Sequence, residues 1–179
     1  MLKRFFTRRI DRFEREWGYD SGHLREVLSA SERAFAKIAL IGPLIRHRED
    51  VPDDLHWAAA LTATAAAGCE PCLALVVEMA RRSGLGQPLM DAILAGDAER
   101  MTAAAAIGYR FATAVTARDA VAAGRTRGEV LRQWGRKAVV SLSITVATAS
   151  FYPSLKYGVG KGRVTGGLGA AVARRRAAA

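Results

Sequence analysis

The chain contains few of the residues that hold small secreted proteins or β-rich proteins together. Only two of its 179 residues are cysteines, too few for the disulfide framework of a small extracellular domain. Aromatic residues make up 7%, and no alternation of apolar and polar residues lasts beyond a few positions, which argues against β-strands. Residues 1–15 are basic and amphipathic and lack the apolar core of a signal peptide, so we expect a cytoplasmic protein.

Acidic residues are scarce in the last third of the chain. Residues 1–50 carry a net charge of +3 and residues 51–120 a net charge of −3, so the overall +10 arises from residues 121–179, where Glu129 is the single acid. A nucleic-acid-binding surface usually adds aromatic residues or a recognisable module to its charge, and the sequence offers neither. We therefore interpret the charge as a solvated basic tail and predict no specific nucleic-acid partner. A weak contact with nucleic acid or acidic lipid is the alternative.

Long uninterrupted apolar runs are missing as well. Residues 57–80 are mostly apolar, but Glu70, Pro71 and Glu78 interrupt them. Residues 138–152 carry no charge, but at 1.5 Å per residue they are too short for a hydrocarbon core of about 30 Å. We therefore predict buried helices and no membrane span.

Helix signals recur along the chain, and the predicted fold is all-α, a single helical bundle. Ser29-Ala30-Ser31-Glu32 and Thr126-Arg127-Gly128-Glu129 match capping boxes, and Pro52 before two aspartates indicates a first helical turn. Gly84 and Gly96 follow apolar stretches and are expected to end helices. The expected helices cover about 30–41 (ended or kinked at Pro43), 53–68, 70–83, 88–94, 97–115 and 136–150 (ending before Pro153).

Composition divides the chain into three parts. These are a basic amphipathic N-terminal segment (1–20), a helical domain (21–157) and a glycine-rich basic tail (158–179). The tail matches neither a P-loop nor a dinucleotide fingerprint, because Gly162 follows Lys161 and Arg163 interrupts G-x-G-x-x-G. We therefore predict no cofactor.

Three of the expected helices carry few charges on any face: 54–67, 70–83 and 136–150. A lone domain of this size would leave more apolar surface exposed than such domains usually do. Burial across a subunit interface removes apolar surface from water with a gain of roughly 25 cal/mol per Å². We therefore expect a homo-oligomer, with the 70–83 helix near the interface.

Both cysteines lie in one tetrapeptide, Cys69-Glu70-Pro71-Cys72, at the expected start of a helix. Unpaired backbone N–H groups and the positive end of the helix dipole meet there and favour a thiolate, the nucleophilic form of cysteine. One helical turn brings residues i and i+3 close enough for a disulfide. The sequence therefore predicts a reversible intramolecular disulfide, with Cys69 as the nucleophile and Cys72 as the resolving thiol. The order reverses if burial favours Cys72.

Other candidate residues near the cysteines are few. His56 lies 13 residues before Cys69 and could face the thiols if its helix bends; the alternative is a partly exposed histidine at a helix start. Glu70 is interpreted as a capping carboxylate, with general acid–base work as the alternative. His23 and His47 have no partner at a useful spacing, and we expect both at the surface. A zinc site built from the cysteines, His56 and one more ligand would lack a second close-spaced pair, so no metal is predicted.

Several segments follow the Cys-x-x-Cys helix in a distinctive order. They are Ala80-Arg81-Arg82-Ser83-Gly84-Leu85, Asp91-Ala92-Ile93-Leu94-Ala95-Gly96-Asp97, Tyr109-Arg110-Phe111-Ala112-Thr113-Ala114 and Tyr152-Pro153-Ser154-Leu155-Lys156-Tyr157-Gly158. Over residues 20–160 this order resembles the alkylhydroperoxidase AhpD / carboxymuconolactone decarboxylase superfamily. The resemblance implies an AhpD-like helical bundle that assembles into dimers, trimers or hexamers. In the Cys-x-x-Cys branch it implies a dithiol that reduces peroxides and is recycled by a thiol reductant.

The chain departs from the superfamily at the positions that relay protons. Active members typically read Glu-x11-Cys-x-His-Cys-x3-His. The glutamate position is Trp57 here, and the two histidine positions are Pro71 and Val76. The resemblance thus implies catalytic Cys69 and Cys72 without the relay that usually serves them.

These observations leave three hypotheses. The first is a thiol–disulfide redox protein or weak alkylhydroperoxidase-like antioxidant, acting on a small peroxide or disulfide and served by an unidentified thiol reductant. The second is a non-catalytic helical oligomeric scaffold whose cysteines only pack. The third is a decarboxylase-type enzyme acting on a lactone, which requires a proton-transfer residue that the sequence does not supply.

Overall fold

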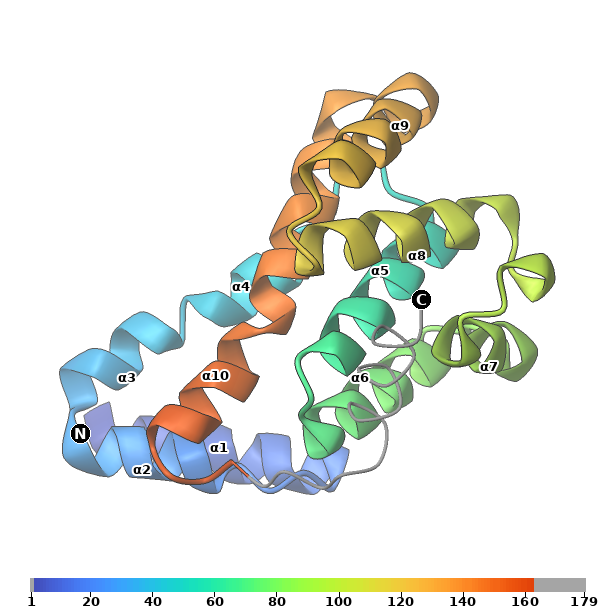
Figure 1. Cartoon of the computed structure of the whole chain (residues 1–179). Helices are drawn as coiled ribbons and strands as arrows, with labels where there is room; N and C mark the ends of the chain where they lie inside the picture. Colours follow the sequence, from blue (N-terminus) through green and yellow to red (C-terminus); the bar gives the residue numbers. More distant parts are fainter. Residues whose placement is uncertain (1, 163–179) are drawn as a thin grey trace.

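The computed structural model describes residues 2–162, and this part of the chain consists of helices and short turns without a β-strand (Figure 1). The expected all-α fold is therefore confirmed. The helices are α1 (Leu2–Trp17), α2 (Gly22–Ala30), α3 (Glu32–Ile38), α4 (Ile41–Ile45), α5 (Asp53–Ala66), α6 (Glu70–Arg82), α7 (Gln87–Ala95), a 3-10 turn (Ala98–Arg100), α8 (Ala103–Thr116), α9 (Ala120–Ala149) and α10 (Phe151–Gly158). Most of the glycine-rich tail expected over 158–179 lies outside the described residues.

Helices α5 and α8 form the centre of the molecule, and α9 packs against both. Leu55 and Phe111 are almost completely buried between them, and Leu142 and Val146 of α9 close this core. Gly108 allows the close approach of the two central helices, because a Cβ atom at this position would collide with the carbonyl oxygen of Leu55. Small residues at the crossing therefore set how tightly the core is packed.

Helices α6 and α7 cover another side of α5. Leu61 of α5, Leu73 of α6, and Met90 and Ile93 of α7 form the centre of this second apolar cluster. Burial of this apolar side of α6 fixes the helix against α5. The N-terminus of α6, where the cysteines lie, is thereby held in place.

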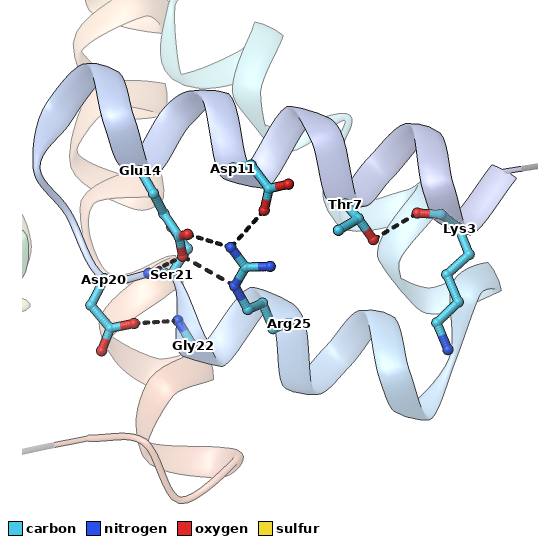
Figure 2. A network of polar contacts seen from close by, with 8 residues as sticks. All are labelled: Lys3, Thr7, Asp11, Glu14, Asp20, Ser21, Gly22 and Arg25. Carbon is cyan, nitrogen blue, oxygen red and sulfur yellow. Dashed lines mark hydrogen bonds and ion pairs between the residues drawn. The ribbon is translucent and has the colours of Figure 1, made fainter.

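The first three helices pack around a third apolar cluster, formed by Phe6, Ile10, Val27, Leu28 and Phe35. A polar network ties α1 to α2 (Figure 2). Arg25 of α2 binds Asp11 at 2.8 Å and also pairs with Glu14, both of α1. The same Glu14 accepts a hydrogen bond from the backbone N–H of Ser21 at 3.0 Å. This network fixes the turn between the two helices, which contains Tyr19.

Helix α10 lies between the N-terminal helices and α5 (Figure 1). Its Leu155 and Val159 pack against the cluster formed by α1–α3. The sequence did not predict this helix, since it expected helical structure to end before Pro153. Pro153 is instead in the first turn of α10, where a missing N–H donor leaves no hydrogen bond unmade.

Several expected helix boundaries are confirmed and others are wrong. Gly96 ends α7, as expected. The capping box read at Ser29 is wrong in its N-cap residue, because Ser29 lies inside α2 and Ser31 caps α3 by accepting from the N–H of Ala34. The capping box expected at Thr126 is wrong, because this threonine lies inside α9 and α9 is capped by Asp119. The helix expected to begin at Asp97 begins later, after Thr102, whose hydroxyl caps α8.

The helix expected over 136–150 is the second half of α9. Gly135 takes a backbone conformation (φ 81°, ψ −174°) outside the helical region and divides α9 in two. By length and composition alone, the stretch Ala120–Gly158 could cross a membrane. One such stretch is weak evidence for a span, because the core helix of a soluble protein passes the same test.

Candidate functional site

The cysteine pair lies where α5 ends and α6 begins. Gly68 has a φ of 68°, which ends α5 and turns the chain toward α6. Cys69 is the N-cap residue of α6, and Cys72 lies in its first turn. The two form a disulfide with their Cα atoms 5.3 Å apart. The expected pairing across one helical turn is therefore present.

Both half-cystines are buried, each with 6% of its surface exposed. Two polar side chains from distant parts of the sequence reach them. The ammonium Nζ of Lys156, on α10, donates to Cys69 Sγ at 4.0 Å. The hydroxyl of Tyr19, in the turn between α1 and α2, lies 3.7 Å from Cys72 Sγ. Each sulfur therefore has one proton-bearing neighbour.

These two neighbours also contact one another and two further rings. Lys156 Nζ lies 4.5 Å from the centroid of the Tyr19 ring, within the range of a cation–π interaction. The ring of His23 contacts that of Tyr19 edge-on at 6.3 Å and that of Tyr152 at 5.9 Å. We call Lys156, Tyr19, His23 and Tyr152 the polar cluster. It lies between α10 and the α1–α2 turn, beside the disulfide.

Burial shifts the pKa value of each residue in the polar cluster in the direction that favours its neutral form. Burial and the nearby Lys156 charge lower the pKa of His23 to about 4, so its imidazole is neutral near pH 7. Burial, with the Asp20 charge, raises the pKa of Tyr19 to about 12, and burial also raises the pKa of Tyr152. Burial lowers the pKa of Lys156, and Asp20 partly opposes this effect. The phenol of Tyr19 thus remains a hydrogen-bond donor across the physiological range.

Of the residues proposed from the sequence, Cys69, Cys72 and Glu70 come together at the start of α6. Glu70 is exposed in the first turn, as a capping carboxylate would be. His56 lies in the first turn of α5, at the opposite end of that helix from the cysteines. Its Nδ1 lies 3.4 Å from Thr145 Oγ1, and no contact with either sulfur occurs within residues 2–162. Burial lowers the pKa of His56 to about 4, with Arg48 adding to the effect.

The expectation that His23 lies at the surface is wrong, since only 2% of it is exposed. His47 is 35% exposed beside Glu49. The three residues that the sequence resemblance matches to a proton relay provide no acid or base: Val76 and Trp57 pack in the cluster around α6, and Pro71 is exposed at the start of the helix.

The sequence alone does not mark Lys156, Tyr19 and Tyr152 as site residues. Tyr19 and Lys156 lie 53 and 87 residues from the cysteines they contact. No spacing rule connects such positions. The sequence contains only a weak signal for Lys156. This lysine has apolar and aromatic neighbours in Phe151-Tyr152-Pro153-Ser154-Leu155-Lys156-Tyr157, which indicates a helix that packs against the rest of the protein and carries the lysine with it.

Among residues 2–162, no group of three or more histidine, cysteine, aspartate or glutamate side chains is arranged to hold a metal ion. Comparisons with protein-family models, with curated proteins and with solved structures found no match. The chemistry of the cysteine pair and its neighbours is therefore the basis for a functional proposal.

Proposed function

We propose that this protein is a thiol–disulfide exchange protein that uses Cys69 and Cys72. In the net reaction, the reduced pair transfers two electrons to a disulfide R–S–S–R′ and becomes a disulfide, while R–S–S–R′ becomes two thiols. Run in reverse, the same steps reduce the Cys69–Cys72 disulfide at the expense of two substrate thiols. The observation that carries the proposal is the disulfide at the N-terminus of α6, with a proton-bearing side chain beside each sulfur.

Three features of the site support this chemistry. The N-terminus of α6 favours a negative charge at Cys69, as a helix start does for any nearby anion. A thiolate formed there has the ammonium of Lys156 within 4.0 Å of its sulfur. The hydroxyl of Tyr19 is placed to donate a hydrogen bond to Cys72 as that sulfur leaves or attacks. A disulfide that only packs requires neither of these neighbours.

We place the protein, on the sequence resemblance, in the Cys-x-x-Cys branch of the AhpD / carboxymuconolactone decarboxylase superfamily. Its relay positions carry Trp57, Pro71 and Val76, so we expect slow reduction of hydroperoxides. Positioned acid–base groups are usually worth a factor of about 100 to 10,000 in rate. Exchange with disulfides depends less on acid–base catalysis, because a thiolate is a good leaving group without protonation.

Mass spectrometry and exchange kinetics test the proposal. Diamide should remove two hydrogens from the reduced protein without forming a covalent dimer, and dithiothreitol should restore both thiols. Excess oxidised glutathione should oxidise the reduced protein and excess glutathione should reduce the oxidised protein, and Cys69→Ser and Cys72→Ser should each abolish both reactions. Consumption of a hydroperoxide should be far slower. Two free thiols that persist after diamide treatment would overturn the redox proposal.

A further inference from the structure

Lys156 is a buried lysine that forms no ion pair with a carboxylate in the described part of the chain. Only 6% of its surface is exposed, and it forms no ion pair within the described residues 2–162. Its Nζ contacts Cys69 Sγ and the face of the Tyr19 ring. A buried ammonium is costly unless a negative charge compensates it. In the oxidised pair neither sulfur carries such a charge, whereas a Cys69 thiolate would.

We infer that Lys156 is a positioning residue that makes Cys69 the thiolate of the reduced pair and favours the reduced state, so that the oxidised protein donates its disulfide to substrate thiols. The inference rests on the proposed function and adds to it a direction, a substrate class and a residue. The substrate class is a pair of thiols, on a small molecule or on a protein surface, that becomes a disulfide.

The reaction balances in two steps. A substrate thiolate attacks Cys69 Sγ and forms a mixed disulfide, and Cys72 leaves with the electron pair of the broken S–S bond. The Tyr19 hydroxyl donates a hydrogen bond to this departing sulfur, which takes up a proton. A second substrate thiolate then attacks the substrate sulfur of the mixed disulfide and releases Cys69 as a thiolate beside Lys156. Two thiols thus lose two electrons and two protons; the pair gains both electrons and one proton, and the other proton enters solvent.

Lys156 is the main positive charge near Cys69, because the groups around it are neutral or acidic. His23, on α2, has a buried neutral ring, and Tyr19 and Tyr152 are phenols. Asp20, in the α1–α2 turn, is the carboxylate that acts on Lys156, and it favours the charged ammonium. An opposite charge within about 4 to 6 Å typically moves a pKa by about one to three units. A Cys69 thiol beside Lys156 should therefore have a lower pKa than the same buried thiol would have without the lysine charge.

Lys156→Met tests this inference, because methionine keeps the buried apolar stem and removes the charge. Lys161→Met is the matched control, since it removes the same charge from an exposed lysine five residues later. Two quantities are measured for each purified, full-length variant: the thiol pKa from thiolate absorbance, and the equilibrium constant with glutathione. Circular dichroism confirms that each variant is folded.

Lys156→Met should raise the Cys69 pKa by at least one unit and shift the glutathione equilibrium toward the oxidised pair by about ten-fold, or about 30 mV. Lys161→Met should change neither quantity by more than about two-fold. Equal effects of the two variants, or no effect of either, would overturn the inference.

A measurement on the unaltered protein keeps the inference testable if Lys156→Met does not fold. With limiting iodoacetamide at mildly acidic pH, reduced protein should be alkylated at Cys69 before Cys72. Alkylation of Cys72 first would overturn the assignment. Failure of the proposed function is distinguishable from these outcomes, because in that case the unaltered protein would show no exchange with glutathione at all.

Discussion

Acidification should destabilise the folded protein through His23. This side chain is 2% exposed between the rings of Tyr19 and Tyr152, and its pKa lies at about 4 instead of 6.5 because of burial and the charge of Lys156. The unfolded chain binds a proton at His23 near pH 6.5, but the folded protein does so only near pH 4. Stability contributed by a neutral His23 is therefore lost progressively as the pH falls through this window.

The difference between the two pKa values sets the size of the effect. At 1.36 kcal/mol per pKa unit, the free energy of unfolding should fall by about 3 kcal/mol between pH 6.5 and pH 4 from this residue. Urea unfolding of the oxidised protein at a series of pH values measures the loss. His23→Phe keeps an aromatic ring and cannot titrate. The unfolding free energy of this variant should therefore fall by about 3 kcal/mol less than that of the unaltered protein between pH 6.5 and pH 4. His47→Gln, at a histidine that is 35% exposed, is the matched control.

The refuting result is specific. If the unfolding free energies of the unaltered protein and of His23→Phe fall in parallel between pH 6.5 and pH 4, His23 does not titrate differently in the folded and unfolded states. The packing of the polar cluster around a neutral imidazole would then be wrong. If His47→Gln flattened the curve as much as His23→Phe, the effect would arise from general charge and not from burial.

Three further predictions concern packing, redox state and assembly. Gly108→Ala should lower the unfolding free energy by about 1–3 kcal/mol in a urea titration, because the added Cβ would collide with Leu55. Gly124→Ala is the control: it has open space around it inside α9 and should raise the unfolding free energy by about 0.5–1 kcal/mol. Equal effects of the two variants would contradict the packing of α5 on α8. The loop closed by Cys69–Cys72 is so short that the disulfide should contribute only about 2 kcal/mol of chain entropy to the unfolding free energy. Reduction should cost less than this amount, because Lys156 stabilises the reduced pair. A larger loss would argue against that role of Lys156. Light scattering at micromolar concentration should give the mass of a homo-oligomer, consistent with exposed Leu131 and Val140 on α9, and a monomer mass would refute this expectation.

The helical part of the fold was largely predictable, because it depends on local signals. The Pro52-Asp53-Asp54 start of α5 and the Gly96 end of α7 are fixed by residues within one turn of the helix terminus. The errors have physical causes too. Thr126 matches a capping box, but Asp119 offers a stronger cap earlier, and its helix continues through Thr126 until Gly135.

The candidate site was predictable only in its covalent part. Cys69 and Cys72 are close in sequence, and the geometry of one helical turn suffices to place them together. The groups that give the pair its environment come from other helices. Tyr19 reaches Cys72 because Arg25 and Glu14 fix the α1–α2 turn, and Lys156 reaches Cys69 because α10 packs on the N-terminal cluster. Such contacts depend on tertiary structure, which local patterns do not encode.

The site has two opposing influences on the Cys69 thiol, and their relative size decides its chemistry. Burial penalises a thiolate, and the penalty for a buried ion in a protein is several kcal/mol. A unit positive charge 4 Å away stabilises the thiolate by about 4 kcal/mol at the effective dielectric constant typical of proteins, and this contribution is of the same order as the burial penalty. The helix terminus adds about 0.3–1 kcal/mol. The two contributions are comparable, so the inferred role of Lys156 predicts that removing its charge leaves the burial penalty uncompensated and makes Cys69 a less reactive thiol. The positions that the sequence resemblance matches to a proton relay carry Trp57, Pro71 and Val76, none of which is an acid or a base. Under the inference above, the lysine from α10 takes the place of such a relay as the group that makes the pair reactive.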